Sequence, residues 1–155
     1  MAYAGKKYFE DIQVGDTDEA DATYVVTEDE IIEVGTRWDP QPFHTKPEAA
    51  AKSIFGGLVA SSVHLFAIYS RLCAQLKTKF IVMSALGFGD VRLHAPARPG
   101  DILMLQVTHV PTRRSRSHPD CGILETTGRV FNQNGELVLS VVSTTLIKCA
   151  TPEGL

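Results

Sequence analysis

A carboxylate and an imidazole stand close together in residues 39–44, which read DPQPFH. Pro40 and Pro42 fix φ near −65° and disfavour a helical conformation in the residue before each of them, so the segment is predicted to be a stiff loop. Asp39 and His44, held on such a loop, could take a proton and return it, which is general acid/base chemistry. Both also have a structural interpretation, in which Asp39 caps nearby amides and His44 stands at a helix entry.

A second segment, residues 55–64 (FGGLVASSVH), predicts the start of a helix. Two glycines are followed by small residues and then by apolar ones. The first turn of a helix offers backbone N–H groups without intrahelical partners and a partial positive charge. Such a helix start suits a substrate oxygen that becomes negative during a reaction. Together with an acid/base pair, it is the outline of an enzyme site.

These two segments must be positioned by the helices and strands around them, which can be predicted from capping residues and from the distribution of apolar residues. Thr27, followed by three acidic residues, predicts a helix with Thr27 as its N-cap and Glu30 at the capping-box position. Residues 47–52 predict a short helix, and residues 60–77 predict a long helix that is apolar on most sides and therefore lies in the core. Strands are predicted at residues 23–27, 80–86, 87–94, 102–111, 122–131 and 137–149, with a type I′ hairpin turn at residues 134–135. Helices followed by a run of antiparallel strands predict an α+β fold.

Size and composition narrow the class of protein. A chain of 155 residues with a formal net charge of −3 is most simply one domain, and it lacks the basic stripe of a nucleic-acid-binding protein. No apolar run approaches the ~20 residues of a membrane span, and the basic N-terminal segment lacks the apolar stretch of a secretory signal. Cys73, Cys121 and Cys149 are odd in number and widely spaced, which fits neither a disulfide framework nor a metal site. We therefore expect a cytoplasmic protein without metal or membrane partners.

The chain resembles a known family at several of these places. Residues 39–44 look like the D-x-N-P-x-H signature of the MaoC-like dehydratases, a hot-dog-fold family that includes (R)-specific enoyl-CoA hydratases. Four further segments are similar to the opening, central turn and closing strands of such domains, namely residues 8–16, 92–101, 115–123 and 132–136. The resemblance covers about residues 8–148. It implies one hot-dog domain over residues 1–155, with an antiparallel sheet wrapped around one long central helix.

The resemblance also implies a reaction. Asp39 and His44 would hold and activate a water that adds to C3 of a trans-2-enoyl-CoA, giving an (R)-3-hydroxyacyl-CoA, or would catalyse the reverse dehydration. Coenzyme A would enter as part of the acyl-CoA substrate, and no other cofactor would be needed. Hot-dog domains of this length commonly dimerise, so a homodimer or a higher homo-oligomer is expected, with the pocket at or near the interface between subunits.

The predicted oxyanion or substrate-binding residues are Gly57, Ser61 and Ser62. Ser62 departs from the family pattern, because the hydratases usually have glycine there with its N–H directed at the thioester carbonyl. Serine keeps an N–H but adds a Cβ and a hydroxyl, which would crowd a position that needs positive φ or close approach. In the structural alternative, Ser61 or Ser62 only caps the helix. Gln41 replaces the usual asparagine of the signature with a longer side chain.

Several other residues are candidates with structural alternatives. Phe43, Trp38 and His64 could line an acyl pocket, although plain packing explains them as well. Arg113, Arg114 and Arg116, with Lys77 and Lys79, could meet the phosphates of coenzyme A, or they could form a solvated strand end. Two other functions remain open. One is an acyl-CoA thioesterase on the same fold, and the other is a non-catalytic acyl-CoA-binding protein.

Overall fold

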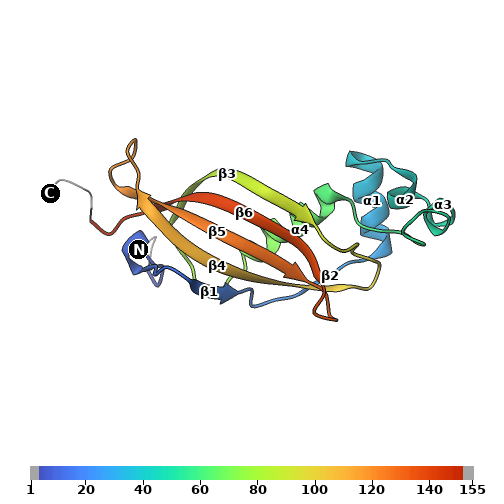
Figure 1. The fold of residues 1–155 in the computed structure, drawn as a ribbon, viewed down its shortest axis with the longest axis horizontal. Coiled ribbons are helices and arrows are strands. Elements are labelled where there is room, and N and C mark those ends of the chain that lie inside the picture. The colour runs from blue at the N-terminus through green and yellow to red at the C-terminus, as the bar shows by residue number, and fades with distance from the viewer. Residues whose placement is uncertain (1–3, 152–155) are drawn as a thin grey trace.

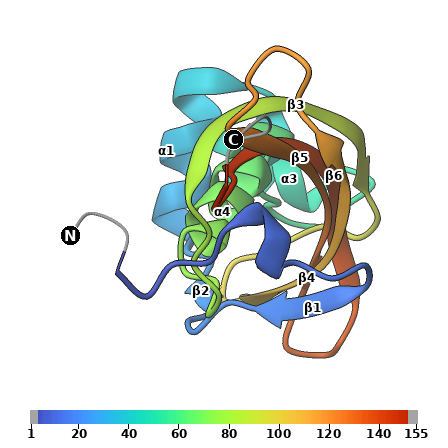
Figure 2. The same cartoon turned by 90° about the vertical axis from the view of Figure 1, so that its left-hand side faces the viewer.

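A curved antiparallel sheet wraps around one helix in the computed structural model, which describes residues 4–151 (Figures 1 and 2). The sheet order is β1-β4-β5-β6-β3, and the short β2 pairs with β4. The strands are β1 (Asp16–Glu19), β2 (Tyr24–Val25), β3 (Val82–Leu93), β4 (Ile102–Arg114), β5 (Cys121–Phe131) and β6 (Leu137–Lys148). All strand pairs are antiparallel, as predicted. Residues 1–3 and 152–155 of the predicted 1–155 domain lie outside the described part.

The helices fall between β2 and β3 in the chain, apart from one 3-10 turn at Phe9–Asp11. They are α1 (Glu28–Trp38), α2 (Pro42–Thr45), α3 (Pro47–Ala51) and α4 (Ser62–Cys73). Helices α1, α2 and α3 gather at one end of the sheet, and α4 lies inside its curve (Figures 1 and 2). The predicted α+β class is therefore confirmed. Within residues 4–151, no helix has the length and apolar character needed to cross a bilayer.

The core forms where α4 meets the concave face of the sheet. Leu65, Ile68 and Leu72 on α4 are buried, as are the alternate β4 residues Leu103 and Leu105. Alternation along the strands follows from their period of two, which sends every second side chain to one face. Buried apolar side chains of this kind supply most of the driving force that holds helix and sheet together.

Three predicted elements differ from the structure. The central helix begins at Ser62 rather than residue 60 and ends at Cys73 rather than residue 77, because Ser61 caps it at one end and the chain turns after Ala74 at the other. Strands predicted separately at residues 80–86 and 87–94 form one strand, β3, whose pairing with β6 contains register shifts near Gly87 and Gly89. Glycine often lies at such irregularities within a strand. The prediction divided the strand at Gly87 because glycine can also end a strand.

The hairpin between β5 and β6 is confirmed, but its turn type is not I′. A type I′ turn requires positive φ at both central residues. Here Gly135 has φ of 74°, whereas Asp90 is the only non-glycine residue in 4–151 with positive φ, so Asn134 does not qualify. The Gly135 N–H donates to the Asn132 carbonyl, at 3.0 Å, and the Asn132 N–H donates to the Glu136 carbonyl. This pattern is typical of a three-residue loop that ends in a left-handed glycine.

Candidate active site

Asp39 and His44 are placed by the junction of α1 and α2. Asp39 is the C-cap of α1, and its backbone N–H still donates to the Gly35 carbonyl at 2.9 Å. Pro40 then stops the helix, and Pro42 begins α2 at a position where its missing N–H costs nothing. His44 follows within the single turn of α2 and is buried, while the Asp39 side chain is 30% exposed. The loop predicted over residues 39–44 is therefore shorter in the structure, because Pro42 begins the helical turn α2 that contains His44.

His44 is held by one short hydrogen bond that also determines its tautomer. Its Nδ1 lies 2.6 Å from the Val59 carbonyl oxygen. A carbonyl can only accept, so the Nδ1–H donates to it, and in the neutral imidazole Nε2 is left with a free lone pair. The ring is further packed edge-on against Phe43, with centroids 4.5 Å apart. His44 therefore presents a basic nitrogen in a fixed orientation.

The basic nitrogen of His44 and the carboxylate of Asp39 face each other across a short gap. Nε2 lies 3.5 Å from Asp39 Oδ2. Both atoms are hydrogen-bond acceptors when Asp39 is ionised and His44 is neutral. A water in the space beside the two atoms could therefore donate one hydrogen to each of them. That space is a cavity of ≈ 390 Å³ lined by this pair, Phe43, Ser62 and Leu65, among others. The structure thus brings together the two residues predicted to act as the acid/base pair.

The start of α4 lies on the same cavity. Ser61 is its N-cap, and the Ser61 hydroxyl oxygen accepts a hydrogen bond from the His64 N–H at 3.3 Å. The N–H groups of Ser62 and Val63, in the first helical turn, have no hydrogen-bond partner among the described residues. Ser62 does not have positive φ, so its Cβ causes no backbone strain. Serine, where the hydratases usually have glycine, therefore keeps a backbone N–H without a hydrogen-bond partner among the described residues, and Ser62 itself lines the cavity.

Four predicted pocket residues lie elsewhere in this chain. Trp38 is 62% exposed and stacks with Arg37, outside the cavity wall. Gly57 does not line the cavity, and a Cβ added there would be 3.7 Å from Arg98 Nη1. Ser61 is buried as a cap, and His64 lines a different crevice. These residues do not line the cavity of the same chain, because sequence proximity to the candidate pair does not specify which side of a helix or loop faces it.

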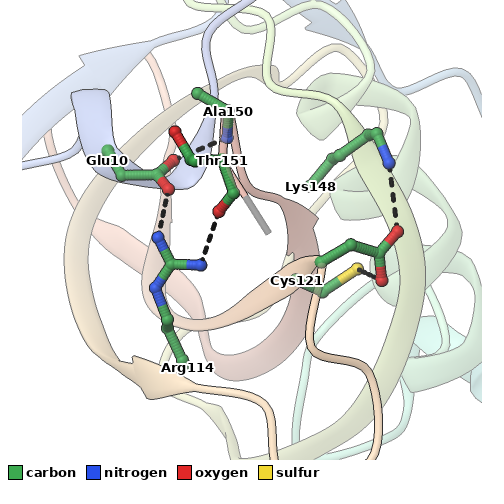
Figure 3. A network of polar contacts seen from close by, with 7 residues as sticks. Glu10, Arg114, Cys121, Lys148, Ala150 and Thr151 are labelled. Carbon is green, nitrogen blue, oxygen red and sulfur yellow. Dashed lines mark hydrogen bonds and ion pairs between the residues drawn. The ribbon is translucent and has the colours of Figure 1, made fainter. Parts of the chain in front are cut away.

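The predicted phosphate-binding arginines do not reach this cavity within one chain. Arg113 and Arg114 end β4, at the opposite end of the sheet from α1–α3 (Figure 1). Arg114 bridges Glu10 at 2.6 Å and the Thr151 carbonyl at 2.8 Å (Figure 3). The exposed Arg116 follows in the same connection, Lys77 pairs with Glu19, and Lys79 donates to the Ala74 carbonyl. The solvated strand-end interpretation fits these contacts better than a role at the cavity of the same chain.

Sequence reasoning missed a residue that supports the pair from behind. A Cβ added at Gly35 would lie 2.7 Å from the His44 carbonyl oxygen and 2.9 Å from the His44 Cβ. Glycine at this buried position of α1 therefore permits the close approach of α2. It also missed Leu93 to Pro96, which form part of the cavity wall. The sequence offered one signal for Gly35, which is a glycine inside a strongly helical pattern. Glycine is unfavourable within a helix, so its presence there points to a packing requirement.

Comparison with known proteins identifies the family. The family described as MaoC like domain matches residues 11–127, so the chain belongs to the MaoC-like dehydratases, and its architecture is the hot-dog fold. A search of curated proteins finds no match. No group of three or more His, Cys, Asp or Glu side chains within residues 4–151 could hold a metal ion.

Solved structures agree with this assignment. The MaoC-like dehydratase from Rhodospirillum rubrum is 32% identical, with a TM-score of 0.83 over 94% of this chain and 99% of that one. A protein from Archaeoglobus fulgidus, described as a monoamine oxidase regulatory protein, is 28% identical, with a TM-score of 0.84 over 96% and 99%. The (R)-hydratase from A. caviae involved in PHA biosynthesis is 23% identical, with a TM-score of 0.65 over 89% and 97%, and shares the fold.

The Gly35–His44 contact predicts a strong effect of one added methyl group. In an isolated helix, Gly35→Ala would be stabilising by about 1 kcal/mol. Here we expect it to lower the free energy of unfolding by about 1–3 kcal/mol, because the methyl group meets backbone and Cβ atoms that cannot rotate away. Urea denaturation measures this. The exposed neighbour Thr36→Ala is the control, and a Gly35→Ala protein as stable as the wild type would contradict the proposed packing.

Proposed function

We propose that the protein is a hydratase/dehydratase that interconverts trans-2-enoyl-CoA and (R)-3-hydroxyacyl-CoA. The observation that carries this proposal is that His44, Asp39 and Ser62, the first residue of α4, line one cavity, with the His44 Nε2 lone pair facing the Asp39 carboxylate. Membership of the MaoC-like dehydratases supports the reaction class. The acyl-CoA form of the substrate rests on the sequence resemblance.

In the proposed hydration, the water held between Asp39 and His44 adds to C3 of the substrate. As its oxygen bonds to C3, one of its protons passes to the His44–Asp39 pair, and the electron pair of the C2–C3 double bond moves towards the thioester carbonyl. The pair then returns the proton to C2 on the same face, which completes the addition of one water molecule. Proton transfer by positioned side chains typically contributes about 10²–10⁴-fold to such a rate.

The thioester oxygen becomes negative in this step and needs a partner that is already in place. The N–H groups of Ser62 and Val63 are oriented by the helix, and the partial positive charge of the α4 N-terminus favours an anion there. Because these amides do not reorganise as charge develops, they stabilise the transition state more than solvent would. The proposed roles of Asp39, His44 and Ser62 therefore form one connected mechanism.

Removing either member of the pair tests the reaction directly. We expect Asp39→Asn and His44→Ala each to lower kcat for hydration of a short trans-2-enoyl-CoA by at least about 10²-fold, since each loses a proton acceptor. Loss of enoyl absorbance measures the rate, and circular dichroism checks the fold. Wild-type rates in both variants would exclude this loop as the catalytic one. Release of free thiol would instead identify a thioesterase, and tight binding without turnover would identify a binding protein.

The role of the Ser62 amide can be tested separately from its side chain. Ser62 is the first residue of α4, where proline is well tolerated, and the extended Ser61 (ψ 162°) suits a following proline. Ser62→Pro removes the N–H and the hydroxyl, and it places the ring Cδ on the backbone nitrogen. We expect it to lower kcat by about 10²–10³-fold, as the loss of one oxyanion donor does. Ser62→Ala keeps the amide and is the control, and equal activity of the two variants would argue against the amide.

We further propose that the protein forms a homodimer through β3. This strand ends the sheet order, and all twelve of its residues are exposed, with six large apolar ones among them. A long, apolar edge strand is a template for pairing with another chain, and two antiparallel copies would continue the sheet with two-fold symmetry. Leu93 lies both on this edge and on the cavity wall, which links the interface to the site.

Charges placed on this edge are expected to separate the subunits. Leu86 and Val91 are exposed on β3 and line no cavity described above. We expect Leu86→Lys with Val91→Lys to convert a dimer into a monomer, because paired copies would bury the added charges. Light scattering coupled to size exclusion measures the mass. Val14→Lys, on an exposed loop, is the control, and a double variant that stays dimeric would contradict β3 as the interface.

A further inference from the structure

A second imidazole–carboxylate pair lies on the other side of the first turn of α4. His64 Nε2 is 3.4 Å from Glu30 Oε2, and the His64 side chain is 2% exposed. Neither ring nitrogen of His64 makes a hydrogen bond. The pair lines a crevice of ≈ 280 Å³ together with Tyr24 and Arg71. These atoms take no part in the proposed hydration, so their burial needs a separate explanation.

Glu30 connects three elements of the fold at this point. Its backbone N–H donates to the Thr27 hydroxyl, so it is fixed in the first turn of α1. Its carboxylate accepts a hydrogen bond from the Tyr24 hydroxyl of β2 and faces His64 of α4. The predicted capping box would require the Glu30 side chain to turn back to the backbone N–H of Thr27. It instead points to Tyr24 and His64, so the capping box is not formed. Burial and this bond to Glu30 raise the pKa of Tyr24 to about 12, so Tyr24 stays a donor.

An apolar side chain would fill the position of His64 at less cost. Burying an imidazole without full hydrogen bonding destabilises the folded protein. Burial also lowers the pKa of His64, against the opposing effect of the Glu30 carboxylate. At neutral pH the ring is therefore uncharged, and its interaction with Glu30 is an N–H facing a carboxylate. A costly buried polar contact that links two helices provides defined geometry rather than stability.

Helices α1 and α4 carry Asp39 and Ser62 of the proposed chemistry, and α2 carries His44. Glu30 stands in the first turn of α1, and Asp39 caps the other end of the same helix. His64 comes two residues after Ser62, which lines the cavity of the proposed chemistry. Since a helix moves as a stiff unit, a contact between Glu30 and His64 limits how far α1 can slide along α4. A misplacement of about 1 Å between reacting groups can lower a rate by about 10²-fold.

We propose that Tyr24, Glu30 and His64 form a polar clamp that positions Asp39 relative to the amides at the start of α4. The three are positioning residues, because they act through α1 and α4 and do not touch the catalytic cavity. This inference rests on the proposed hydratase function. The charged and titratable groups facing His64 are Glu30 of α1, Tyr24 of β2 and Arg71 of α4.

The kinetic test separates positioning from binding. We expect Glu30→Gln and His64→Phe each to lower kcat for enoyl-CoA hydration by about tenfold or more, with KM changed less than about twofold, because the substrate does not contact the clamp. In the double variant the losses should not multiply, since both changes break one contact. Tyr24→Phe, which deletes one oxygen, should lower kcat in the same way. Glu33→Gln, on the exposed side of α1, is the matched control.

A second readout does not depend on activity. Proton NMR follows the titration of the His64 imidazole in the folded protein. We expect its midpoint to lie below the ordinary histidine value and to fall further in Glu30→Gln, because the neighbouring carboxylate favours the charged ring. If the wild-type protein hydrates no enoyl thioester but shows this shift, the proposed function is wrong. The contact between Glu30 and His64 would still be established. An active wild type, with unchanged kcat in Glu30→Gln and His64→Phe, would overturn the clamp.

Discussion

The candidate site depends on the hydrogen bond from His44 Nδ1 to the Val59 carbonyl. This 2.6 Å contact leaves the lone pair on the nitrogen that faces Asp39, and it holds the ring against rotation. It is reinforced by the Val59 N–H, which donates to the Phe43 carbonyl, so α2 and the segment before α4 are joined twice. That segment leads within two residues to the Ser61 cap. The base and the free amides of α4 are therefore positioned by one short stretch of backbone, which is the condition for a preorganised site.

The parts predicted from sequence are those that local chemistry determines. Prolines on both sides of Gln41 restrict the backbone wherever they occur, so the tight link between Asp39 and His44 could be predicted from six residues. Thr27 caps α1 for a similarly local reason, because its hydroxyl needs only the amide three residues ahead. The residue types of β4, β5 and β6 likewise predicted these strands without knowledge of their partners.

The errors concern contacts between segments distant in sequence. Gly35 is needed because α2 folds back against α1, and no pattern within α1 reveals which face α2 will cover. Arg113 and Arg114 form a basic cluster in the sequence, but the antiparallel register carries them to the end of the sheet away from α1–α3. His64 is only two residues from Ser62, yet a helix turns about 200° over two residues, at ~3.6 residues per turn, so the two side chains serve different spaces.

This division of α4 into two faces bears on the serine at position 62, where the hydratases usually have glycine. If the thioester were bound by a special backbone conformation, a Cβ would disturb it. The amides instead belong to an ordinary helical turn, whose geometry is the same for serine and glycine. What the turn requires is that it does not move while charge develops on the substrate. Ser61 secures it from within by capping, and residues on the opposite face secure it against α1, so the side chain at position 62 is left free to vary.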